Sequence, residues 1–329
     1  MRMFSKAVHA LAVALVACVG ATSVHAGSYP EKPIKLVVPY PPGGGIDPSA
    51  RVLAEGLSKI LGVTVYVDNQ GGASGRIGTS AVAHAKPDGY TLLYGSVAPN
   101  VILPAAYGDS VGYQEDKDFI PIALVAQADY VLLVSTLLPV NSVQDLVEYA
   151  RQHPQEITYA SSGLLSGPHL AGELLGKLGD VQLTHVPYRG NGPALSAVMS
   201  GEVSMTFDSA GGVVGRGKSD RYKVLAVTGG PPLDAFPEAP SLGKLYPGHD
   251  VSQWYGVFTT TGTPPDVVAR LQTAVHDVVN SNLVKLKFAD MGLRVILDST
   301  PDSFRAYLNG EIERWHHFIV TNNIPVPPT

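Results

Sequence analysis

Cysteine is almost absent from this chain of 329 residues. The single one, Cys18, lies close to the N-terminus, and none follows it. A folded domain without cysteines holds no disulfides, which excludes the small stapled scaffolds common among exported proteins. It also holds no cysteine nucleophile. Its stability has to come from hydrophobic cores, and about 300 residues are enough to bury two of them.

Charge is sparse as well. Only 16% of the residues are charged, the formal net charge is −5, and Lys and Arg form no cluster. An acidic surface without basic patches speaks against nucleic-acid partners and against binding to anionic membranes. Beyond the N-terminus, no run approaches the roughly 18 unbroken apolar residues of a membrane span. An anionic ligand would therefore have to be held locally, by backbone dipoles or single side chains.

The N-terminus has the pattern of an export signal. Basic residues at Arg2 and Lys6 precede an apolar stretch over residues 7–19, and small residues follow up to Ala26. This order predicts a signal peptide over residues 1–26, cleaved after Ala26. An alternative interpretation stays open, because residues 15–18 read LVAC and resemble a bacterial lipobox. In that case Cys18 would carry a lipid anchor.

The stretch PYPPGGGID, residues 39–47, is the most informative in the chain. It follows an apolar run at 34–38 that is typical of a buried strand, and apolar residues at helical spacing come after it up to residue 61. The pattern predicts a strand, a glycine-rich turn and a helix with Asp47 as N-cap. Glycines leave the main-chain N–H groups accessible, and the start of a helix favours anions. A tight turn with nothing bound is the alternative.

Strands and helices alternate through the rest of the chain, which predicts an α/β fold with a parallel sheet. Further strands are expected at 63–67, 91–94, 157–160, 183–187, 203–207, 222–228 and 294–297. Helices are expected at 77–85, 142–153, 169–178, 193–199, 263–281, 284–291 and 300–320. Loops rich in Gly and Ser follow the strands at 68–75, 161–168, 188–192 and 208–212. Residues 231–248 are expected to be irregular.

Two apolar stretches are expected to cross between two lobes. The first covers residues 122–135 and is interrupted by polar residues at 127–129, and the second covers 251–259. The predicted division is lobe 1 at 27–127, lobe 2 at 128–252 and a return to lobe 1 at 253–329. Because Gly- and Ser-rich loops end strands in both lobes, a small ligand is expected to bind in the cleft between them.

Nine short motifs resemble one known family across essentially the whole mature chain. That family is the substrate-binding proteins of tripartite tricarboxylate transporters, also called the Bug family of periplasmic receptors. Each motif is weak alone, but their order and spacing are specific. They are PPGGGID at 41–47, Asn69 with GASG at 72–75, PDGYTLL at 87–93, YASSG at 159–163, HLAGEL at 169–174, VPYRG at 186–190, FD at 207–208, LAVT at 225–228 and GTPPDVV at 262–268.

The resemblance implies a type II-like periplasmic binding protein, with two Rossmann-like lobes joined by two crossover strands. It implies a periplasmic receptor that closes on a small carboxylate and delivers it to the membrane subunits of a transporter. No cofactor, metal or enzymatic activity is implied, and we expect a monomer. The family holds its ligands through loop amides, hydroxyls and waters rather than an arginine clamp.

Residue by residue, the resemblance carries a ligand site over to both lobes. In lobe 1 it implies Tyr40, Gly43, Gly44, Gly45, Asp47, Ser96 and Asn100. In lobe 2 it implies Ser161, Ser162, Gly163, Leu164, Ser166, His169, Tyr188, Arg189, Gly190 and Asp208.

Three positions near this site depart from the family pattern. Ile46 stands where Thr is common, and Leu164 and Leu165 stand where a polar residue and Gly are frequent. Aliphatic side chains there would cover the uncharged body of a ligand, so an aromatic or other apolar-bodied carboxylate is expected rather than a citrate-like one. Ser209, where the family usually has Asn, is a further departure.

Two alternative functions stay open at this point. A receptor that signals to a partner has the same sequence features as one that delivers its ligand for transport. An exported hydrolase is the other alternative, because Ser162, His169 and Asp208 supply the residue types of a catalytic triad. The local patterns of hydrolases, such as G-x-S-x-G and H-E-x-x-H, are missing from the sequence.

Overall fold

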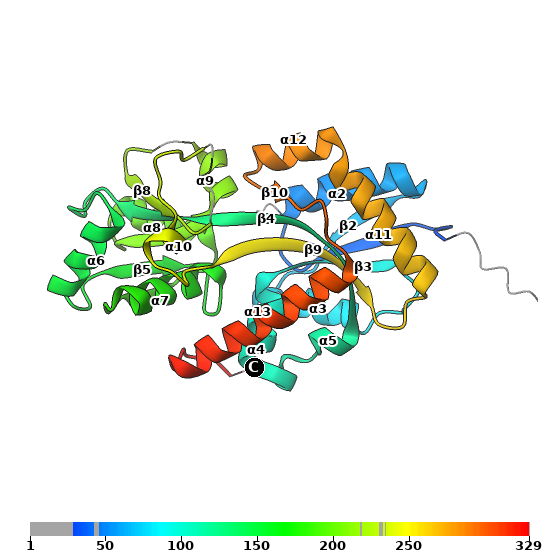
Figure 1. Ribbon diagram of the computed structural model, residues 1–329, viewed down its shortest axis with the longest axis horizontal. Helices are drawn as coiled ribbons and strands as arrows, with labels where there is room; N and C mark the ends of the chain where they lie inside the picture. The colour runs from blue at the N-terminus through cyan, green and yellow to red at the C-terminus, as the bar shows by residue number, and fades with distance from the viewer. Residues whose placement is uncertain (1–28, 43–45, 218, 230–232, 234, 329) are drawn as a thin grey trace, which may run out of the picture.

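The structure is a computed structural model that describes residues 29–42, 46–217, 219–229, 233 and 235–328 (Figure 1). The predicted signal peptide with Cys18 and the three glycines Gly43, Gly44 and Gly45 lie outside these residues. The first half contains β1 (Ile34–Val38), α2 (Ile46–Leu61), β2 (Val65–Asn69), the 3₁₀ turn η1 (Ala73–Gly75), α3 (Arg76–Ala83), β3 (Thr91–Ser96), the π-helical turn η2 (Ala98–Ile102), α4 (Leu103–Tyr107), η3 (Gly108–Val111), α5 (Glu115–Asp118) and β4 (Phe119–Ser135).

The second half alternates in the same way. It contains α6 (Val143–Gln152), β5 (Thr158–Ser161), α7 (Gly167–Gly179), β6 (Thr184–Pro187), α8 (Asn191–Ser200), β7 (Met205–Ser209), α9 (Ala210–Arg216), β8 (Tyr222–Val227), α10 (Leu242–Leu245), β9 (Ser252–Thr260), α11 (Pro265–Asn280), α12 (Asn282–Asp290), β10 (Arg294–Val295) and α13 (Pro301–Thr321).

One continuous mixed sheet runs through the molecule in the order β2-β1-β3-β9-β4-β7-β5-β6, with β8 and β10 also paired to β4. Strand β4 pairs with β9 up to Asp129 and with β7 from Tyr130 onward. β4 and β9 therefore connect two halves, which Figure 1 shows side by side. Lobe 1 denotes all elements from β1 to the first part of β4, together with β9 and the elements from α11 to α13. Lobe 2 denotes the last part of β4 and all elements from α6 to α10.

This architecture confirms the two-lobed α/β fold with two crossover strands. The all-parallel sheet is wrong, because β9 runs antiparallel to both β3 and β4, and β4 runs antiparallel to β7 and β8. The predicted interruption of the first crossing is also wrong. Gln127 and Asp129 pair with Trp254 and Ser252 of β9, so these polar residues continue the ladder instead of breaking it. The exact lobe boundaries stay predictions.

Local corrections concern the ends of elements and short helices. Helix α2 begins at Ile46, so Asp47 lies in its first turn rather than at the N-cap. Strand β2 begins two residues later than predicted. The predicted loop at 208–212 contains the start of α9, because the Ser209 hydroxyl caps it by accepting a hydrogen bond from the Gly212 N–H. The irregular stretch at 231–248 contains α10, and the region 98–118, for which no element was predicted, is largely helical.

Amphipathic helices cover both faces of the sheet in lobe 1. Helix α2 places Ile46, Leu53 and Leu57 on one buried face at helical spacing, and this face packs with α11 on the strands. In Figure 1, α2, α11 and α12 lie on one side of the sheet, and α3, α4, α5 and α13 lie on the other. None of the helices in the described part of the chain is long and apolar enough to cross a membrane.

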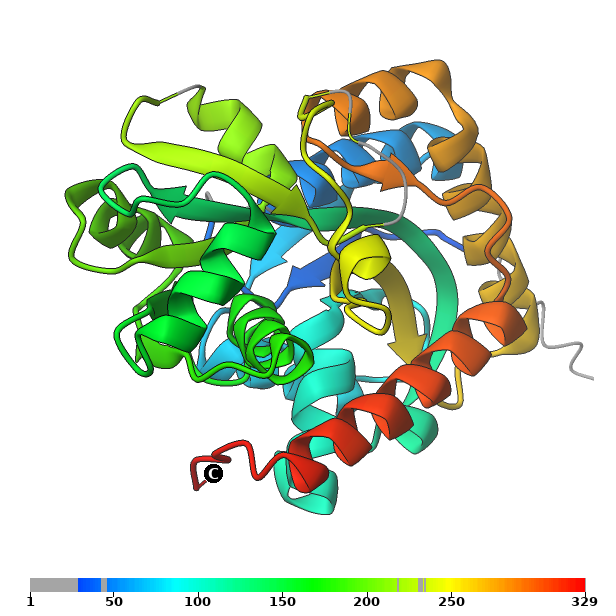
Figure 2. The same cartoon turned by 60° about the vertical axis from the view of Figure 1, so that its left-hand side comes forward.

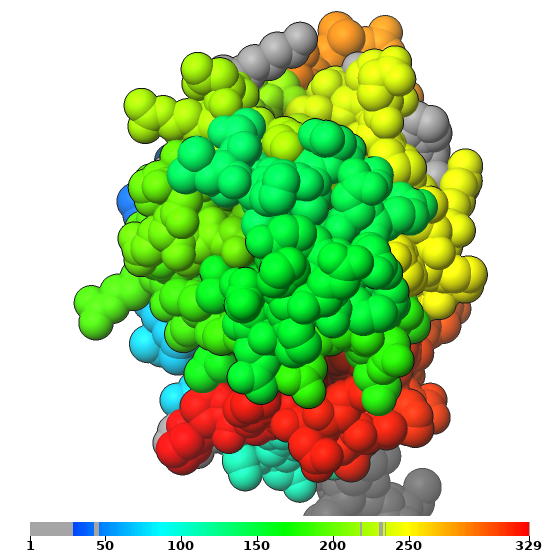
Figure 3. All heavy atoms as spheres, turned by 90° about the vertical axis from the view of Figure 1, so that its left-hand side faces the viewer, coloured from blue at the N-terminus to red at the C-terminus, as the bar shows by residue number. Residues whose placement is uncertain are grey.

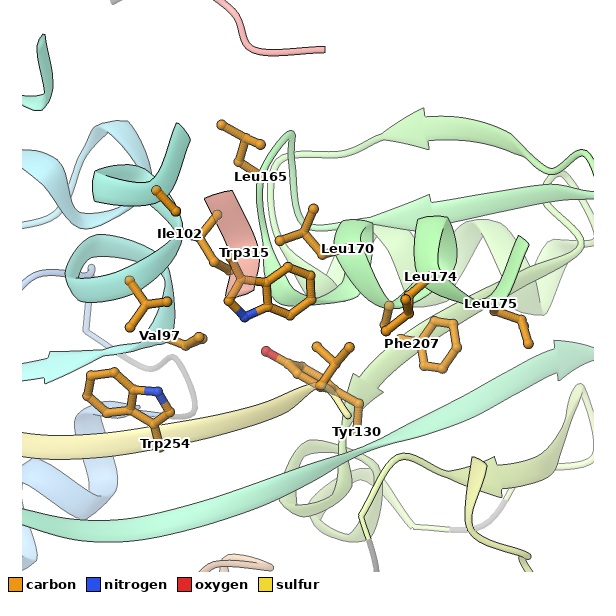
Figure 4. Packing of buried hydrophobic residues seen from close by; sticks show 14 of the residues in the cluster. Val97, Ile102, Tyr130, Leu165, Leu170, Leu174, Leu175, Phe207, Trp254 and Trp315 are labelled. Atoms are coloured by element: carbon orange, nitrogen blue, oxygen red, sulfur yellow. The ribbon is translucent and has the colours of Figure 1, made fainter. Parts of the chain in front are cut away.

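One hydrophobic core joins the two lobes. It contains Val97 of lobe 1 and Trp315 of α13 together with Leu170 and Phe207 of lobe 2, and each of these side chains is almost fully buried. Figure 4 shows Trp315 between residues of η2 and residues of α7. Separate cores lie within lobe 1 and within lobe 2. In this structure the lobes are therefore packed against each other rather than spread apart.

Candidate functional site

The lobe 1 part of the predicted site lies at the C-terminal ends of β1 and β3. The Tyr40 hydroxyl lies 3.1 Å from the Ser96 hydroxyl, and burial raises the pKa of Tyr40 to about 12. Both groups are therefore neutral hydrogen-bonding partners at physiological pH. Asn100, also predicted, is fully buried, and its side-chain carbonyl accepts a hydrogen bond from the Ser96 N–H at 3.1 Å.

Behind Asn100, a buried carboxyl group supports this half of the site. The Asn100 amide donates to Oε2 of Glu115 at 2.9 Å, and Nη1 of Arg305 lies 3.6 Å from Oε1. Burial raises the pKa of Glu115 to about 8, against the opposing effects of the Asn100 hydrogen bond and the Arg305 charge. Asn100 thus positions the end of β3, and neither Glu115 nor Arg305 was recognised in the sequence.

Asp47 is held by side chains of its own lobe. Its carboxylate accepts hydrogen bonds from Arg51 Nε at 3.1 Å and from the Asn69 amide at 3.0 Å. The Asn69 amide also lies 3.1 Å from the Tyr40 carbonyl oxygen. Asp47 and Asn69 therefore tie the start of α2 to the ends of β1 and β2.

In lobe 2, the loop of residues 161–166 is closed by its own hydrogen bonds. The Ser161 hydroxyl accepts from the Gly163 N–H at 3.1 Å, and the Ser166 hydroxyl donates to the Gly163 carbonyl at 2.7 Å. Gly163 has a φ of 132°, a conformation that favours glycine. Ser166 caps α7, a helix of 13 residues. Ser162 and Leu164 lie half-buried on this loop.

His169 fixes the loop from behind. Its Nδ1 accepts a hydrogen bond from the Leu165 N–H at 3.0 Å, which holds Leu165 at a φ of 57°. The imidazole rings of His169 and His185 lie 4.0 Å apart, and Nε2 of His185 lies 2.6 Å from the Ser161 hydroxyl. Burial lowers the pKa of His169 to about 3 and that of His185 to about 4. Both rings are therefore neutral and position the loop.

Asp208 forms a second anchor in lobe 2. It is almost fully buried and is bonded to the Arg216 guanidinium, to the Asn191 amide at 2.7 Å and to the Ser209 N–H at 2.7 Å. Burial nevertheless raises the pKa of Asp208, because desolvation outweighs these partners. Asp208 thus holds the starts of α8 and α9 together, and the sequence did not indicate Arg216 or Asn191 as its partners.

The remaining predicted residues lie between β6 and α8. Gly190 has a φ of 111° and precedes α8, and Arg189 is exposed. The Tyr188 hydroxyl donates to Glu202 at 2.8 Å. Among the described residues, no hydrogen bond joins the side chain of Tyr188 or of Arg189 to the loop of residues 161–166.

Side chains on the crossover strands connect the two halves. The Tyr130 hydroxyl donates to Gln253 at 2.9 Å, and a Cβ on Gly167 at the start of α7 would meet that hydroxyl at 2.1 Å. Burial raises the pKa of Tyr130, and the neighbouring ionisable groups of Tyr255, Tyr40 and Asp208 raise it further. Tyr130 is therefore within electrostatic reach of predicted site residues from both lobes. No family motif pointed to this position.

The predicted apolar cover is only partly in place. Ile46 packs into the lobe 1 core, and Leu165 is buried in the core that joins the lobes. Figure 4 shows Leu165 beside Ile102 of η2. Of the three aliphatic residues, Leu164 alone is half-buried and so remains able to contact a ligand.

Two of the three residues of the alternative triad, His169 and Asp208, are engaged elsewhere. Nδ1 of His169 accepts from the Leu165 backbone, and its Nε2 lies 3.6 Å from Glu173. Asp208 is bonded to Arg216 and Asn191. A base oriented by a carboxylate and facing a serine hydroxyl, as a triad needs, is thus not formed by these side chains.

A cavity of about 1330 Å³ lies away from the predicted site, on the outer side of lobe 2. It is lined by Arg151, Glu173 and Lys177 together with the C-terminal segment after α13, and by none of the predicted residues. Figure 3 faces this end of the molecule and shows the red C-terminal segment below the green residues of lobe 2. The cavity therefore contains neither residues 161–166 nor any other described residue of the predicted ligand site.

Comparison with protein families decides where the chain belongs. Residues 49–324 match the family described as the tripartite tricarboxylate transporter family receptor. The chain is a member of this receptor family. Protein BugT of Bordetella pertussis is 33% identical over 296 residues, which is 90% of each chain.

Solved structures of relatives agree with the fold. R. palustris Rpa4515, solved with adipate, superposes with a TM-score of 0.80 at 32% identity and covers 90% of this chain and 99% of its own. MatC from Rhodopseudomonas palustris, solved with bound malate, has a TM-score of 0.76 at 30% identity, covering 88% and 99%. Both of these relatives were thus solved with small carboxylates, and BugD, at 30% identity and a TM-score of 0.79, is a periplasmic binding protein.

Proposed function

We propose that this receptor binds a small carboxylate between its lobes and delivers it to the membrane subunits of a tripartite transporter. The observation that carries the proposal is that polar groups gather at strand ends in each lobe. Tyr40 and Ser96 supply hydroxyls from lobe 1, and the loop of residues 161–166 that caps α7 supplies serine hydroxyls from lobe 2. Family membership and the adipate and malate complexes of relatives support the ligand class.

Such a site suits an anion without a dedicated cation. The start of α7 carries the positive end of the helix dipole, which favours a negative group by about 0.3–1 kcal/mol. Hydrogen bonds to a charged group add about 1.5–3 kcal/mol each. Asp47 and Asp208 are already bonded to basic side chains, so their charges are largely balanced and repel an incoming carboxylate less.

The body of the ligand is proposed to be apolar, a medium aliphatic or aromatic group. This preference rests on Leu164, because Ile46 and Leu165 are used in the cores. Burial of about 50 Å² against one leucine contributes roughly 1 kcal/mol. The preference over a citrate-like ligand is therefore modest, about five- to tenfold in affinity.

A thermal-shift panel tests the ligand class. Adipate, benzoate, malate and citrate are added to the purified protein, and the melting temperature is followed, because a ligand that binds only the folded state raises it. Adipate or benzoate is expected to give the largest shift. A larger shift with citrate would contradict the apolar preference, and no shift with any small carboxylate would contradict the proposed class.

Delivery for transport needs a cellular test. Uptake of the radiolabelled acid is expected to fall in cells that lack this receptor and to return when it is restored. If cells without the receptor take up the acid normally but no longer respond to it by a change in transcription, the signalling alternative is supported instead.

A further inference from the structure

A backbone contact between the lobes leaves no room for a side chain. Gly211 of α9 in lobe 2 lies against the turn between α12 and β10 in lobe 1. A Cβ added to Gly211 would lie 1.7 Å from the Met291 carbonyl oxygen and 2.7 Å from the carbonyl carbon. From the other side, a Cβ on Gly292 would meet the backbone N of Gly211 at 2.6 Å. Figures 1 and 2 both show α9 facing the α12–β10 segment.

The lobe 1 side of this contact is firmly held. Within the turn, the Gly292 N–H donates to Ala289 at 2.9 Å and the Leu293 N–H donates to Phe288 at 2.9 Å. Beyond it, β10 pairs with β4, and Arg294 lies 3.5 Å from the buried carboxylate of Asp129. The Met291 carbonyl therefore cannot turn away without disturbing the pairing at the crossover strand.

The lobe 2 side is equally fixed. Ser209 caps α9, and Ala210 and Val213 are buried in the lobe 2 core. Gly211 therefore cannot withdraw into its own lobe. Since both partners are backbone atoms, no rotamer change relieves a clash, and a Cβ at position 211 would force the lobes apart by roughly 1 Å or more.

We propose that the contact of Gly211 with Met291 and Gly292 is the stop that sets how far the lobes close, and that ligand affinity depends on it. Only the link to ligand affinity rests on the proposed function, because lobe closure itself can be measured without ligand. A ligand held by both lobes loses contacts when they are kept apart. The apparent affinity then falls in proportion to the fraction of molecules that still close.

Helix α9 offers a matched pair of substitutions. Gly211→Ala places a methyl group into the contact, whereas Gly215→Ala, one helical turn later, meets no atom within 4 Å. Neither glycine has a positive φ, so alanine is compatible with the backbone at both positions and favours the helix equally. A difference between the variants therefore reports the contact and not the helix.

The closure is measured by electron-spin distances without ligand. Labels are attached at Leu137→Cys in lobe 2 and Leu286→Cys on α12, both exposed positions, in a Cys18→Ser background. The Gly215→Ala variant is expected to keep the wild-type distance distribution, and Gly211→Ala is expected to shift it. Equal distributions for the two variants would overturn the proposal. A Gly211→Ala protein that does not fold would overturn it too, because the contact lies between the lobes and not inside one.

Affinity is then measured by calorimetry with adipate and malate as probes. Gly211→Ala is expected to bind at least tenfold more weakly than Gly215→Ala. A shifted distance distribution with unchanged affinity would overturn the link between closure and binding. If neither probe binds any of the proteins, the proposed ligand class fails while the distance measurement still decides the closure stop.

Discussion

Buried ionisable side chains stand behind the predicted ligand contacts rather than among them. Glu115 supports Asn100 and the end of β3, and His169 and His185 support the loop of residues 161–166. The family resemblance implied Asn100 and His169, but not Glu115, Arg305, His185 or Arg216. These partners lie far along the chain from the residues they hold, and only the fold brings them together.

Glu115 gives a pH dependence with a defined sign. Its pKa is about 8 in the fold against 4.5 for an unperturbed glutamate, so the folded state binds more protons between these values. As far as Glu115 determines it, the free energy of unfolding is therefore highest below pH 4.5. It falls as the pH rises toward 8, by up to about 1.4 kcal/mol per pH unit.

Glu115→Gln removes this dependence and keeps an acceptor for the Asn100 amide. We expect the variant to match the wild type near pH 4.5 and to exceed its stability by at least about 1 kcal/mol at pH 8. Urea unfolding at both pH values measures this, with Asp116→Asn, an exposed neighbour, as the control for the lost charge. A stability difference that is the same at both pH values would show that Glu115 is not the titrating group.

At the scale of elements, two adjacent leucines are assigned different roles. Leu165 is 1% exposed in the core that joins the lobes, whereas Leu164 is half-buried. Leu165→Ala is expected to lower the free energy of unfolding by about 2–5 kcal/mol, as for other buried leucines. Leu164→Ala is expected to cost less than about 1 kcal/mol and to weaken an apolar-bodied acid.

Denaturant unfolding and calorimetry on the two variants separate these roles. Equal losses of stability would mean that the loop does not have the conformation set by His169. If ligand binding is weakened in Leu165→Ala but not in Leu164→Ala, the apolar contact with the ligand is made by Leu165 and not by Leu164.

Elements with strong local patterns were predictable from the sequence. Strand β1 and helices α6, α11 and α13 lie within a few residues of their predicted ranges, because apolar spacing and caps fix them. Helix α9 and the helical turns at 98–111 were not, since α9 is only seven residues long and the turns at 98–111 are interrupted by proline and glycine. The antiparallel course of β9 was missed because strand direction depends on tertiary pairing between β3 and β4.

At the scale of the whole molecule, the chain forms two lobes on one sheet, with β4 and β9 as the connections. The sequence indicated both crossings, but not the core around Trp315 that packs α13 against α7. Nor did it indicate the contact at Gly211. Both are interlobe contacts on opposite sides of the crossover strands, and sequence motifs report loops and elements rather than how two lobes meet.

The central claim is that polar groups at the strand ends of the two lobes bind a carboxylate through its charge. Calorimetric titration with adipate and with adipamide, its neutral counterpart of nearly the same shape, tests this most directly. Adipate is expected to bind at least about 100-fold more tightly, since charge-assisted hydrogen bonds contribute about 1.5–3 kcal/mol each. Binding of adipamide as tight as that of adipate, or no binding of adipate, benzoate, malate or citrate, would contradict the account.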